Sequence, residues 1–154
     1  MISTALPFLL SMIACQVVES PFSQSYSAEG IDLLRMELDK GDITYSGSDS
    51  GSFEIDGRNW GRAGSEEKAA EHQEGNSWDS DISDATLSIW TQSENRRAGI
   101  DFTVPPESTM TVIFKATQSG QGAYNYSQTH IHSLKENIDE ATLIERVKAN
   151  PKKV

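Results

Sequence analysis

Cysteine is almost absent from this sequence, because the 154-residue chain has only Cys15. A single cysteine excludes an intramolecular disulfide. No apolar run reaches the ~20 residues that a membrane-spanning helix needs. An internal repeat with a period of about 20 to 50 residues is also missing. The sequence therefore predicts one domain that is held together by its own core.

Basic residues are also few. The chain has 13 Lys and Arg against 23 Asp and Glu, which gives a formal net charge of −10. Proteins that bind nucleic acid need a basic patch to displace counterions from phosphates, so we expect no nucleic-acid partner. The same imbalance argues against adsorption to an anionic lipid surface by charge alone. Its expected effect is to keep the protein soluble.

Motifs that carry catalysis are missing as well. There is no Gly-x-Ser-x-Gly, P-loop, dinucleotide fingerprint or His-Glu-x-x-His. Residues 79–84 begin like a calcium loop, but Asp84 stands where glycine is needed and Trp90 where glutamate is needed. We therefore expect no enzyme, no catalytic residue and no cofactor. A Ser-His-Asp site assembled from distant parts of the chain stays open.

Two histidines supply the alternative hypothesis. His130 and His132 are two residues apart in a predicted strand, so both side chains are expected on one face. Two imidazoles at this spacing can share Zn²⁺, but a third ligand and usually a fourth are needed. We expect two exposed histidines and no metal site. The alternative function is a periplasmic or secreted metal-binding protein, or a hydrolase, that uses His130 and His132.

Segments in which apolar and polar residues alternate are frequent in the sequence. Ile31 to Trp60 reads as three short strands joined by two tight turns, with Gly41 expected at positive φ in the first turn. Further alternating segments follow up to residue 131. We expect an all-β fold with a single sheet-rich domain, either a β-sandwich or a short β-solenoid-like structure. The inward rows predict one shared core: Leu34, Met36, Leu38, Ile43, Tyr45, Phe53, Ile55, Leu87, Ile89, Ile100, Phe102 and Val104.

Two helices are expected beside the strands. Residues 65–74 predict a short surface helix, because Ser65 is a good N-cap and Gly75 can end it. At the C-terminus, the capping box that begins at Ser133 precedes a helical stripe of apolar residues.

Trp60 is an aromatic residue that lies between Arg58 and Arg62. It suits either an exposed glycan contact or a cap on the open end of the core, and we favour the cap.

The N-terminus is the only long apolar stretch. Residues 1–18 carry no charge, and the run from Ala5 to Ala14 has the length of a signal-peptide core. With Ala14 just before Cys15, the segment resembles the end of the signal in bacterial lipoprotein precursors. That resemblance implies cleavage before Cys15 and lipidation of its sulfur. The alternatives are plain secretion, or a core element with an incidental buried cysteine.

The domain boundaries follow from these segments. We expect a signal peptide at 1–14, a polar tether at 15–30, a β domain at 31–133, and a C-terminal helix and tail at 134–154. Tether composition is indicated by the serines between Pro21 and Gly30. Among lipoproteins of two-membrane bacteria, Asp after the cysteine favours the inner membrane. Gln16 stands there instead, so the resemblance implies the outer membrane.

A second resemblance covers about residues 31–115. Gly41-Asp42-Ile43-Thr44 and Asp101-Phe102-Thr103-Val104-Pro105-Pro106 look like the opening of adhesin-type bacterial envelope proteins. These are β-strand-repeat proteins without a known biochemical function. The resemblance implies a non-catalytic, lipid-anchored cell-envelope protein that acts as a structural or binding module. The expected partners are the membrane, through the anchor at Cys15, and an envelope protein or glycan.

Overall fold

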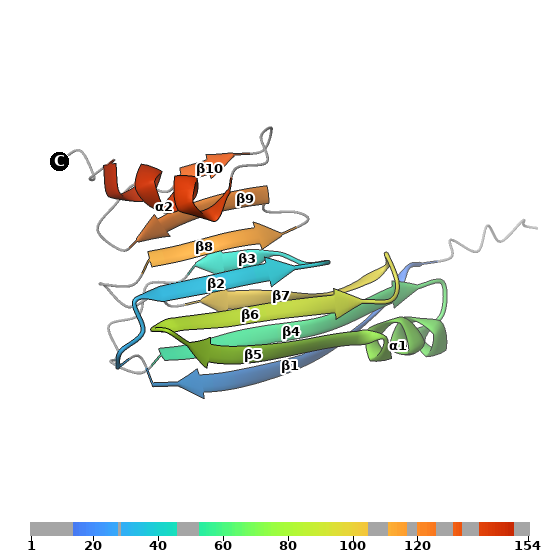
Figure 1. The fold of residues 1–154 in the computed structure, drawn as a ribbon. Coiled ribbons are helices and arrows are strands. Elements are labelled where there is room, and N and C mark those ends of the chain that lie inside the picture. Colours follow the sequence, from blue (N-terminus) through green and yellow to red (C-terminus); the bar gives the residue numbers. More distant parts are fainter. Residues whose placement is uncertain are drawn as a thin grey trace, which may run out of the picture.

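The structure, a computed structural model, describes residues 14–27, 29–45, 53–104, 111–116, 120–125, 131–133 and 139–149. Within these residues the chain forms two β-sheets and two helices, so the predicted all-β class is confirmed at that level (Figure 1). The strands are β1 (Gln16–Tyr26), β2 (Leu33–Leu38), β3 (Ile43–Tyr45), β4 (Phe53–Ala63), β5 (Asn76–Ser83), β6 (Thr86–Ser93), β7 (Ala98–Val104), β8 (Thr111–Ala116), β9 (Gly120–Asn125) and β10 (Ile131–Ser133). The helices are α1 (Glu66–Glu74) and α2 (Glu140–Ala149).

The chain passes back and forth between the two sheets. The four-stranded sheet has the order β1-β4-β7-β3, and the six-stranded sheet has the order β10-β9-β8-β2-β6-β5. Strand β2 runs parallel to both β6 and β8, and β3 runs parallel to β7. The predicted tight turn after β2 is therefore no hairpin. It carries the chain from the six-stranded sheet to the four-stranded one, as the 94–97 segment does between β6 and β7.

Gly41 makes the first of these crossings feasible. Its φ is +138°, and a Cβ placed there would lie 1.9 Å from the carbonyl oxygen of Ile100. Only glycine fits such an approach. The backbone N–H of Ile100 donates to the Lys40 carbonyl at 3.0 Å, and that of Phe102 donates to the Asp42 carbonyl at 2.9 Å. The predicted positive φ at Gly41 is confirmed, and it fixes β3 beside β7.

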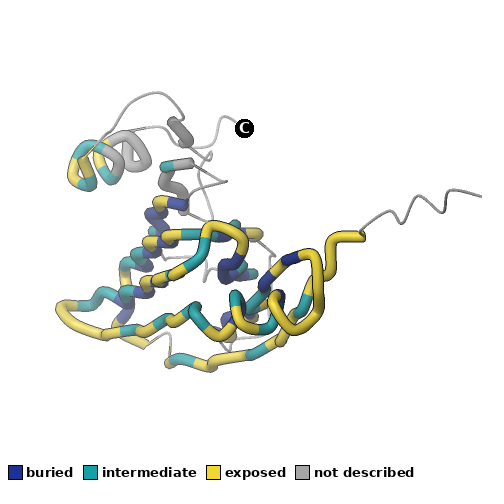
Figure 2. The backbone as a smooth tube through the Cα atoms, turned by 90° about the vertical axis from the view of Figure 1, so that its right-hand side faces the viewer, coloured by how far each residue is buried: buried dark blue, intermediate teal, exposed yellow. Residues whose placement is uncertain are grey.

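Strands of both sheets contribute to one core cluster, which contains the predicted inward rows. Buried and exposed residues alternate along the strands (Figure 2). Eleven of the twelve predicted core residues belong to the observed core cluster, and the side chain of the twelfth, Tyr45, lies outside the described residues. Phe102 is at its centre, because its ring meets Phe22 from β1 at 5.7 Å and Trp78 from β5 at 6.0 Å between centroids.

The predicted tether is wrong over most of its length. Residues Gln16–Tyr26 form β1, which pairs antiparallel with β4 along all eleven residues. An edge strand has one unpaired side, so Pro21 and the many serines are compatible with it. Phe22 anchors the strand by stacking on Trp78, with ring centroids 5.1 Å apart.

Helix α1 confirms its predicted ends. The Ser65 hydroxyl accepts a hydrogen bond from the Lys68 backbone N–H, and Gly75 caps the C-terminus. One face is buried on β4, where a Cβ on Gly61 would lie 2.2 Å from the Ala69 carbonyl oxygen. Gln73 reaches from this face to donate to Ser20 and to the carbonyl of Asn59. The remaining face is largely exposed, as expected for a surface helix.

Helix α2 is present and begins at Glu140, whereas residues 134–136 of the predicted capping box lie outside the described residues. Ser133 ends β10, and Asp139 caps the helix by accepting hydrogen bonds from the backbone N–H and hydroxyl of Thr142. The helix is held near the six-stranded sheet by Arg35, which donates to Glu140 at 2.8 Å through Nε. In the part of the chain that is described, neither helix is long and apolar enough to cross a membrane.

Candidate functional site

The outer face of the six-stranded sheet carries a row of polar side chains with one tryptophan in it. Strand pairing aligns Asp79, Trp90, Glu37, Lys115 and Gln121 across β5, β6, β2, β8 and β9. Side chains directly opposite on neighbouring strands share a face. Trp90 is 39% exposed, although the neighbouring positions on β6, Ile89 and Thr91, are buried. A large aromatic ring therefore stands in a polar row that faces solvent.

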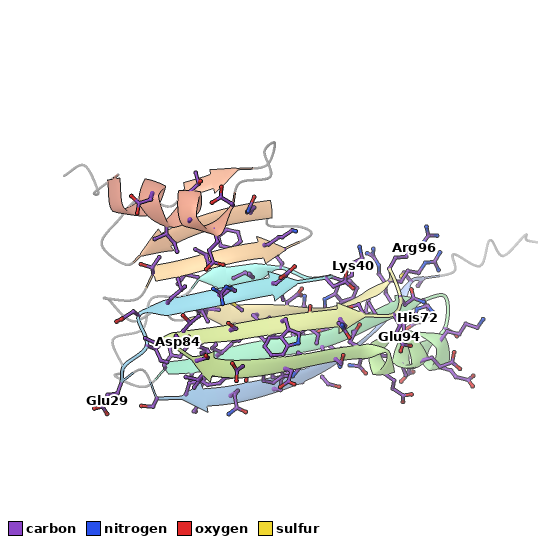
Figure 3. All side chains as sticks on the ribbon, viewed as in Figure 1. Glu29, Lys40, His72, Asp84, Glu94 and Arg96 are labelled. Carbon is purple, nitrogen blue, oxygen red and sulfur yellow. The ribbon has the colours of Figure 1, made fainter. Side chains whose placement is uncertain are left out.

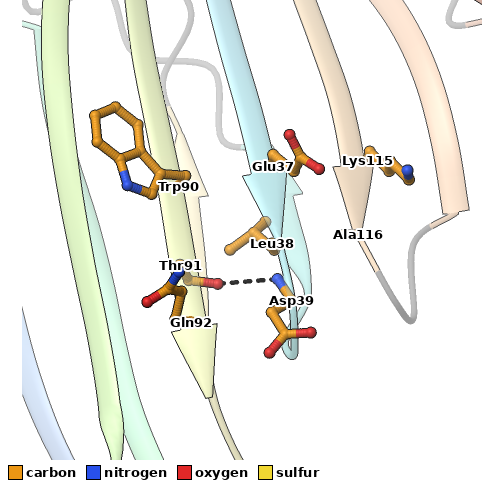
Figure 4. Close-up of a pocket in the computed structure, with 8 residues that line it drawn as sticks. All are labelled: Glu37, Leu38, Asp39, Trp90, Thr91, Gln92, Lys115 and Ala116. Atoms are coloured by element: carbon orange, nitrogen blue, oxygen red, sulfur yellow. Dashed lines mark hydrogen bonds between the residues drawn. The ribbon is translucent and has the colours of Figure 1, made fainter. Parts of the chain in front are cut away.

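A groove of about 520 Å³ opens beside this row, at the end of β2 (Figure 4). Its lining residues come from β6, β2 with the following turn, and β8: Glu37, Leu38, Asp39, Trp90, Thr91, Gln92, Lys115 and Ala116. The backbone N–H of Asp39 donates to Thr91 Oγ1 at 3.0 Å, and Asp39 Oδ2 accepts from the Ser93 N–H at 3.1 Å. These bonds fasten the start of the turn to β6 and fix the shape of the groove.

Two charges of opposite sign stand over the groove. Glu37 and Lys115 are directly opposite on the parallel strands β2 and β8. Neither forms an ion pair within 4 Å with any residue in the described ranges. Their carboxylate and ammonium groups are hydrogen-bonding groups that a ligand can meet without breaking an existing ion pair. Gln92 adds an exposed amide.

The outer face of the four-stranded sheet differs, because its charges are paired. Arg58 donates to Glu19 at 3.0 Å and to Asp101 at 3.2 Å through Nε. Asp101 Oδ1 also accepts from the Trp60 indole N–H at 3.1 Å and from the Asp42 backbone N–H at 3.0 Å. The hydrogen bond from Arg58 to Asp101 raises the pKa of Arg58, and partial burial opposes that change. The charged residues that line the cavity of about 310 Å³ at this place, Asp42, Asp56, Arg58 and Asp101, thus already have partners.

Trp60 does not cap the core as predicted. It lies on the outer face of β4 between Arg58 and Arg62, half-buried, with the Arg62 guanidinium carbon 5.7 Å from the ring centroid. That spacing is a cation–π contact. Trp78 takes the core position instead, through its stacking on Phe22.

The residues singled out from the sequence are scattered. Cys15 is exposed and stands directly before β1. His130 lies outside the described residues, and His132 pairs with Gly122 in β10, while its side chain is not described. The described ranges contain no group of three or more His, Cys, Asp or Glu placed to hold a metal ion. The calcium-like stretch is most of β5 and the turn at Asp84, which has a φ of +50°.

The groove itself was not predicted. Its one sequence signal was Trp90, an aromatic residue at an outward position of an alternating strand. Glu37 and Lys115 gave no signal, because their proximity depends on the parallel pairing of β2 with β8. No protein-family model, curated protein or solved structure matches this chain.

Proposed function

We propose that this protein is a non-catalytic, lipid-anchored binding module of the cell envelope, which binds a glycan on the outer face of its six-stranded sheet. The single observation that carries the proposal is the groove around the exposed Trp90. An exposed tryptophan beside polar groups is typical of binding sites, because one large rigid ring supplies contact area at little entropic cost.

The chemistry of the groove favours a saccharide over other ligands. The indole face of Trp90 can stack on the carbon–hydrogen face of a sugar ring. Glu37 accepts hydrogen bonds, Lys115 donates them, and Gln92 does both, so all three suit hydroxyl groups. A polyanion would meet the carboxylates of Glu37 and Asp39, and a polycation would meet Lys115. The mixed signs therefore favour a neutral or N-acetylated glycan.

The groove lining supports binding rather than turnover. None of the eight lining residues is Ser, Cys or His. The one hydroxyl, on Thr91, accepts a hydrogen bond from the Asp39 backbone N–H and so holds the turn. Glycoside hydrolysis uses two carboxylates instead, which here would be Glu37 and Asp39. Asp39 Oδ2 already accepts a hydrogen bond from the Ser93 N–H and holds the turn.

The anchor and location belong to the same proposal. Cys15 is exposed and precedes the first strand, as a lipidated residue at the start of a mature chain has to be. Two or more acyl chains give stable anchoring, whereas one gives only marginal membrane residence. With Gln16 after the cysteine, the proposed location is the outer membrane.

The parallel pairing of β2 with β6 and of β3 with β7 supports a short solenoid-like coil within a two-sheet sandwich, consistent with an adhesin-type envelope domain.

Binding is tested by presenting immobilised neutral, N-acetylated and acidic oligosaccharides to the purified protein. We expect binding to members of the neutral or N-acetylated class. Trp90→Ala is expected to weaken it at least about 10-fold, because a central aromatic contact typically contributes more than 1–2 kcal/mol. The matched control is Trp60→Ala, which removes the same ring from the other sheet and should leave affinity unchanged. Lack of binding to every glycan, or equal loss in both variants, would contradict the proposal.

The same samples test the alternative hypothesis. Mass spectrometry of each bound oligosaccharide should show it intact after prolonged incubation, and a cleaved product would make the protein a hydrolase. Elemental analysis of protein purified without chelator or a His-tag should show no stoichiometric Zn²⁺. One Zn²⁺ per chain, lost in His132→Ala, would favour the metal-binding alternative.

The anchor has its own test in the intact mass of the mature protein. We expect a chain that begins at Cys15 and carries diacylglycerol. Cys15→Ser should remain an uncut precursor and take up no palmitate analogue. An unlipidated wild-type chain that begins at Met1 would overturn both the anchor and the envelope location.

A further inference from the structure

No linker separates Cys15 from the folded domain, because β1 begins at the next residue, Gln16. Gln16 pairs with Ala63 and Val17 with Arg62, so the first two residues after Cys15 already belong to the four-stranded sheet. A lipid on Cys15 would therefore hold the nearest end of this sheet against the bilayer, without the coil that a tether would provide.

The two faces of that end differ, because the acidic helix α1 packs on the inner face of β4, while the outer face carries arginines. On its outer face, Val17 is 53% exposed and lies opposite Arg62, whose backbone N–H donates to the Arg97 carbonyl at 2.9 Å. Trp60 is next along β4, under the Arg62 guanidinium. Neither Arg62 nor Arg97 has a carboxylate within 4 Å among the described residues. Arg96 and Lys40 lie at the same end of the molecule, together with Glu94 (Figure 3).

We propose that Val17, Trp60, Arg62 and Arg97 form a lipid-docking patch, which rests on the anionic phospholipid headgroups of the membrane in which Cys15 is anchored. This proposal rests on the proposed lipidation of Cys15. Its occupant follows from charge complementarity and position: exposed arginines with an apolar side chain and a tryptophan are the residues that favour the headgroup region. Glu19 lies directly opposite Trp60 within the patch, but it is paired with Arg58, which also pairs with Asp101 one row further on.

The patch also explains how a chain with a net charge of −10 can lie on an anionic surface. Screening limits the reach of charge to about 8–10 Å at physiological salt, so the charge at the contact decides, not the total. The carboxylates of Glu54 and Asp56 are at the opposite end of β4, near Ser23, which donates to both. The outer row of β4 is thus polarised along the strand, with Arg62 near Cys15 and Glu54 and Asp56 away from it.

Docking is tested with the lipidated full-length mature protein in vesicles of phosphatidylethanolamine and phosphatidylglycerol, with phosphatidylcholine vesicles for comparison. Brominated lipids should quench the fluorescence of Trp60, whose signal is the difference between the wild type and Trp60→Phe. We expect quenching in the anionic vesicles that falls at high salt. Arg62→Glu should reduce the docked-to-undocked ratio at least about five-fold, since each basic residue near an anionic surface contributes about that factor. Lys115→Glu makes the same charge change on the other sheet and should leave the quenching of Trp60 unchanged, although it alters the glycan groove.

The outcomes separate docking from anchoring. Suppose that Cys15 carries lipid, but that the quenching is the same in anionic and phosphatidylcholine vesicles and is unchanged by Arg62→Glu. This result would overturn the patch and leave the anchor intact. An unlipidated Cys15 in the mass spectrum would overturn the anchor and, with it, the basis of the patch.

Discussion

The outer faces of the two sheets each carry one tryptophan among charged side chains, yet the two faces differ in how these side chains are paired. On the four-stranded sheet the Trp60 indole N–H donates to Asp101, and Arg58 bridges Asp101 and Glu19. On the six-stranded sheet Trp90 is 39% exposed, and Glu37 and Lys115 form no ion pair with any described residue. The same residue types thus give a closed network on one face and an open groove on the other.

The difference shows why residue type alone does not mark a binding surface. A polar group that already has partners must lose them before it binds a ligand, and that loss offsets most of what the new bonds contribute. Beside Trp90, Glu37 and Lys115 have no ion pair to a described residue to lose. On the four-stranded sheet, Arg62 and the adjacent Arg97, at the end beside Cys15, have no carboxylate within 4 Å among the described residues.

The largest predicted effect concerns the core that supports both faces. Phe102→Ala should lower the free energy of unfolding by about 3–5 kcal/mol, because the ring fills the space between Phe22 and Trp78. Urea denaturation measures it, and both faces should unfold in one transition. Phe102→Leu, which keeps most of the volume, should cost less. A loss below ~1 kcal/mol would mean that the inward face has been misassigned.

The next prediction compares the two faces directly. Asp101→Ala should lower the free energy of unfolding by about 1–3 kcal/mol, because it removes the acceptor of Trp60, Arg58 and the Asp42 backbone N–H. Glu37→Ala is the matched change on the other sheet and should stay within about 0.5 kcal/mol, since it removes no ion pair to a described residue. Equal losses, measured by urea denaturation of both variants, would abolish the contrast between a closed and an open face.

The smallest predicted effect is at the start of α2, which lies near the open face. Backbone and side-chain hydrogen bonds from Thr142 lower the pKa of Asp139 below its ordinary value of 3.8. A lowered pKa means that the cap is fully formed above pH 3.8 and is lost as the pH falls through the folded value. The Thr142 amide resonance should therefore move only in acid, and Asp139→Asn should remove that titration. A change centred above pH 3.8 would assign the titration to another group.

The sequence predicted the core and the ends of α1 because those signals are local. Alternating residues such as Leu87 and Ile89 report an inward row whatever the strand pairs with. Ser65 and Gly75 mark a helix through bonds to their own neighbours. Gly41 reports a backbone conformation in the same way. None of these inferences needed to know which strands are adjacent.

The sequence did not predict β1, the sheet crossings or the groove, because each depends on distant pairing. In β1 the inward Phe22 and Tyr26 are four residues apart with serines between them, so no period of two is visible. Turn 39–42 has the composition of a hairpin, and only the pairing of β3 with β7 shows that it changes sheets. Glu37, Trp90 and Lys115 lie opposite one another on three neighbouring strands that are far apart in the chain.

The central proposal is that the outer face around Trp90 binds the glycan. The most direct measurement is a titration of the three tryptophan indole N–H resonances with a glycan that the protein binds. We expect the Trp90 resonance to shift in a saturable way, while those of Trp60 and Trp78 stay in place because one is bonded to Asp101 and the other is packed on Phe22. A shift at Trp60 with none at Trp90 would contradict the account.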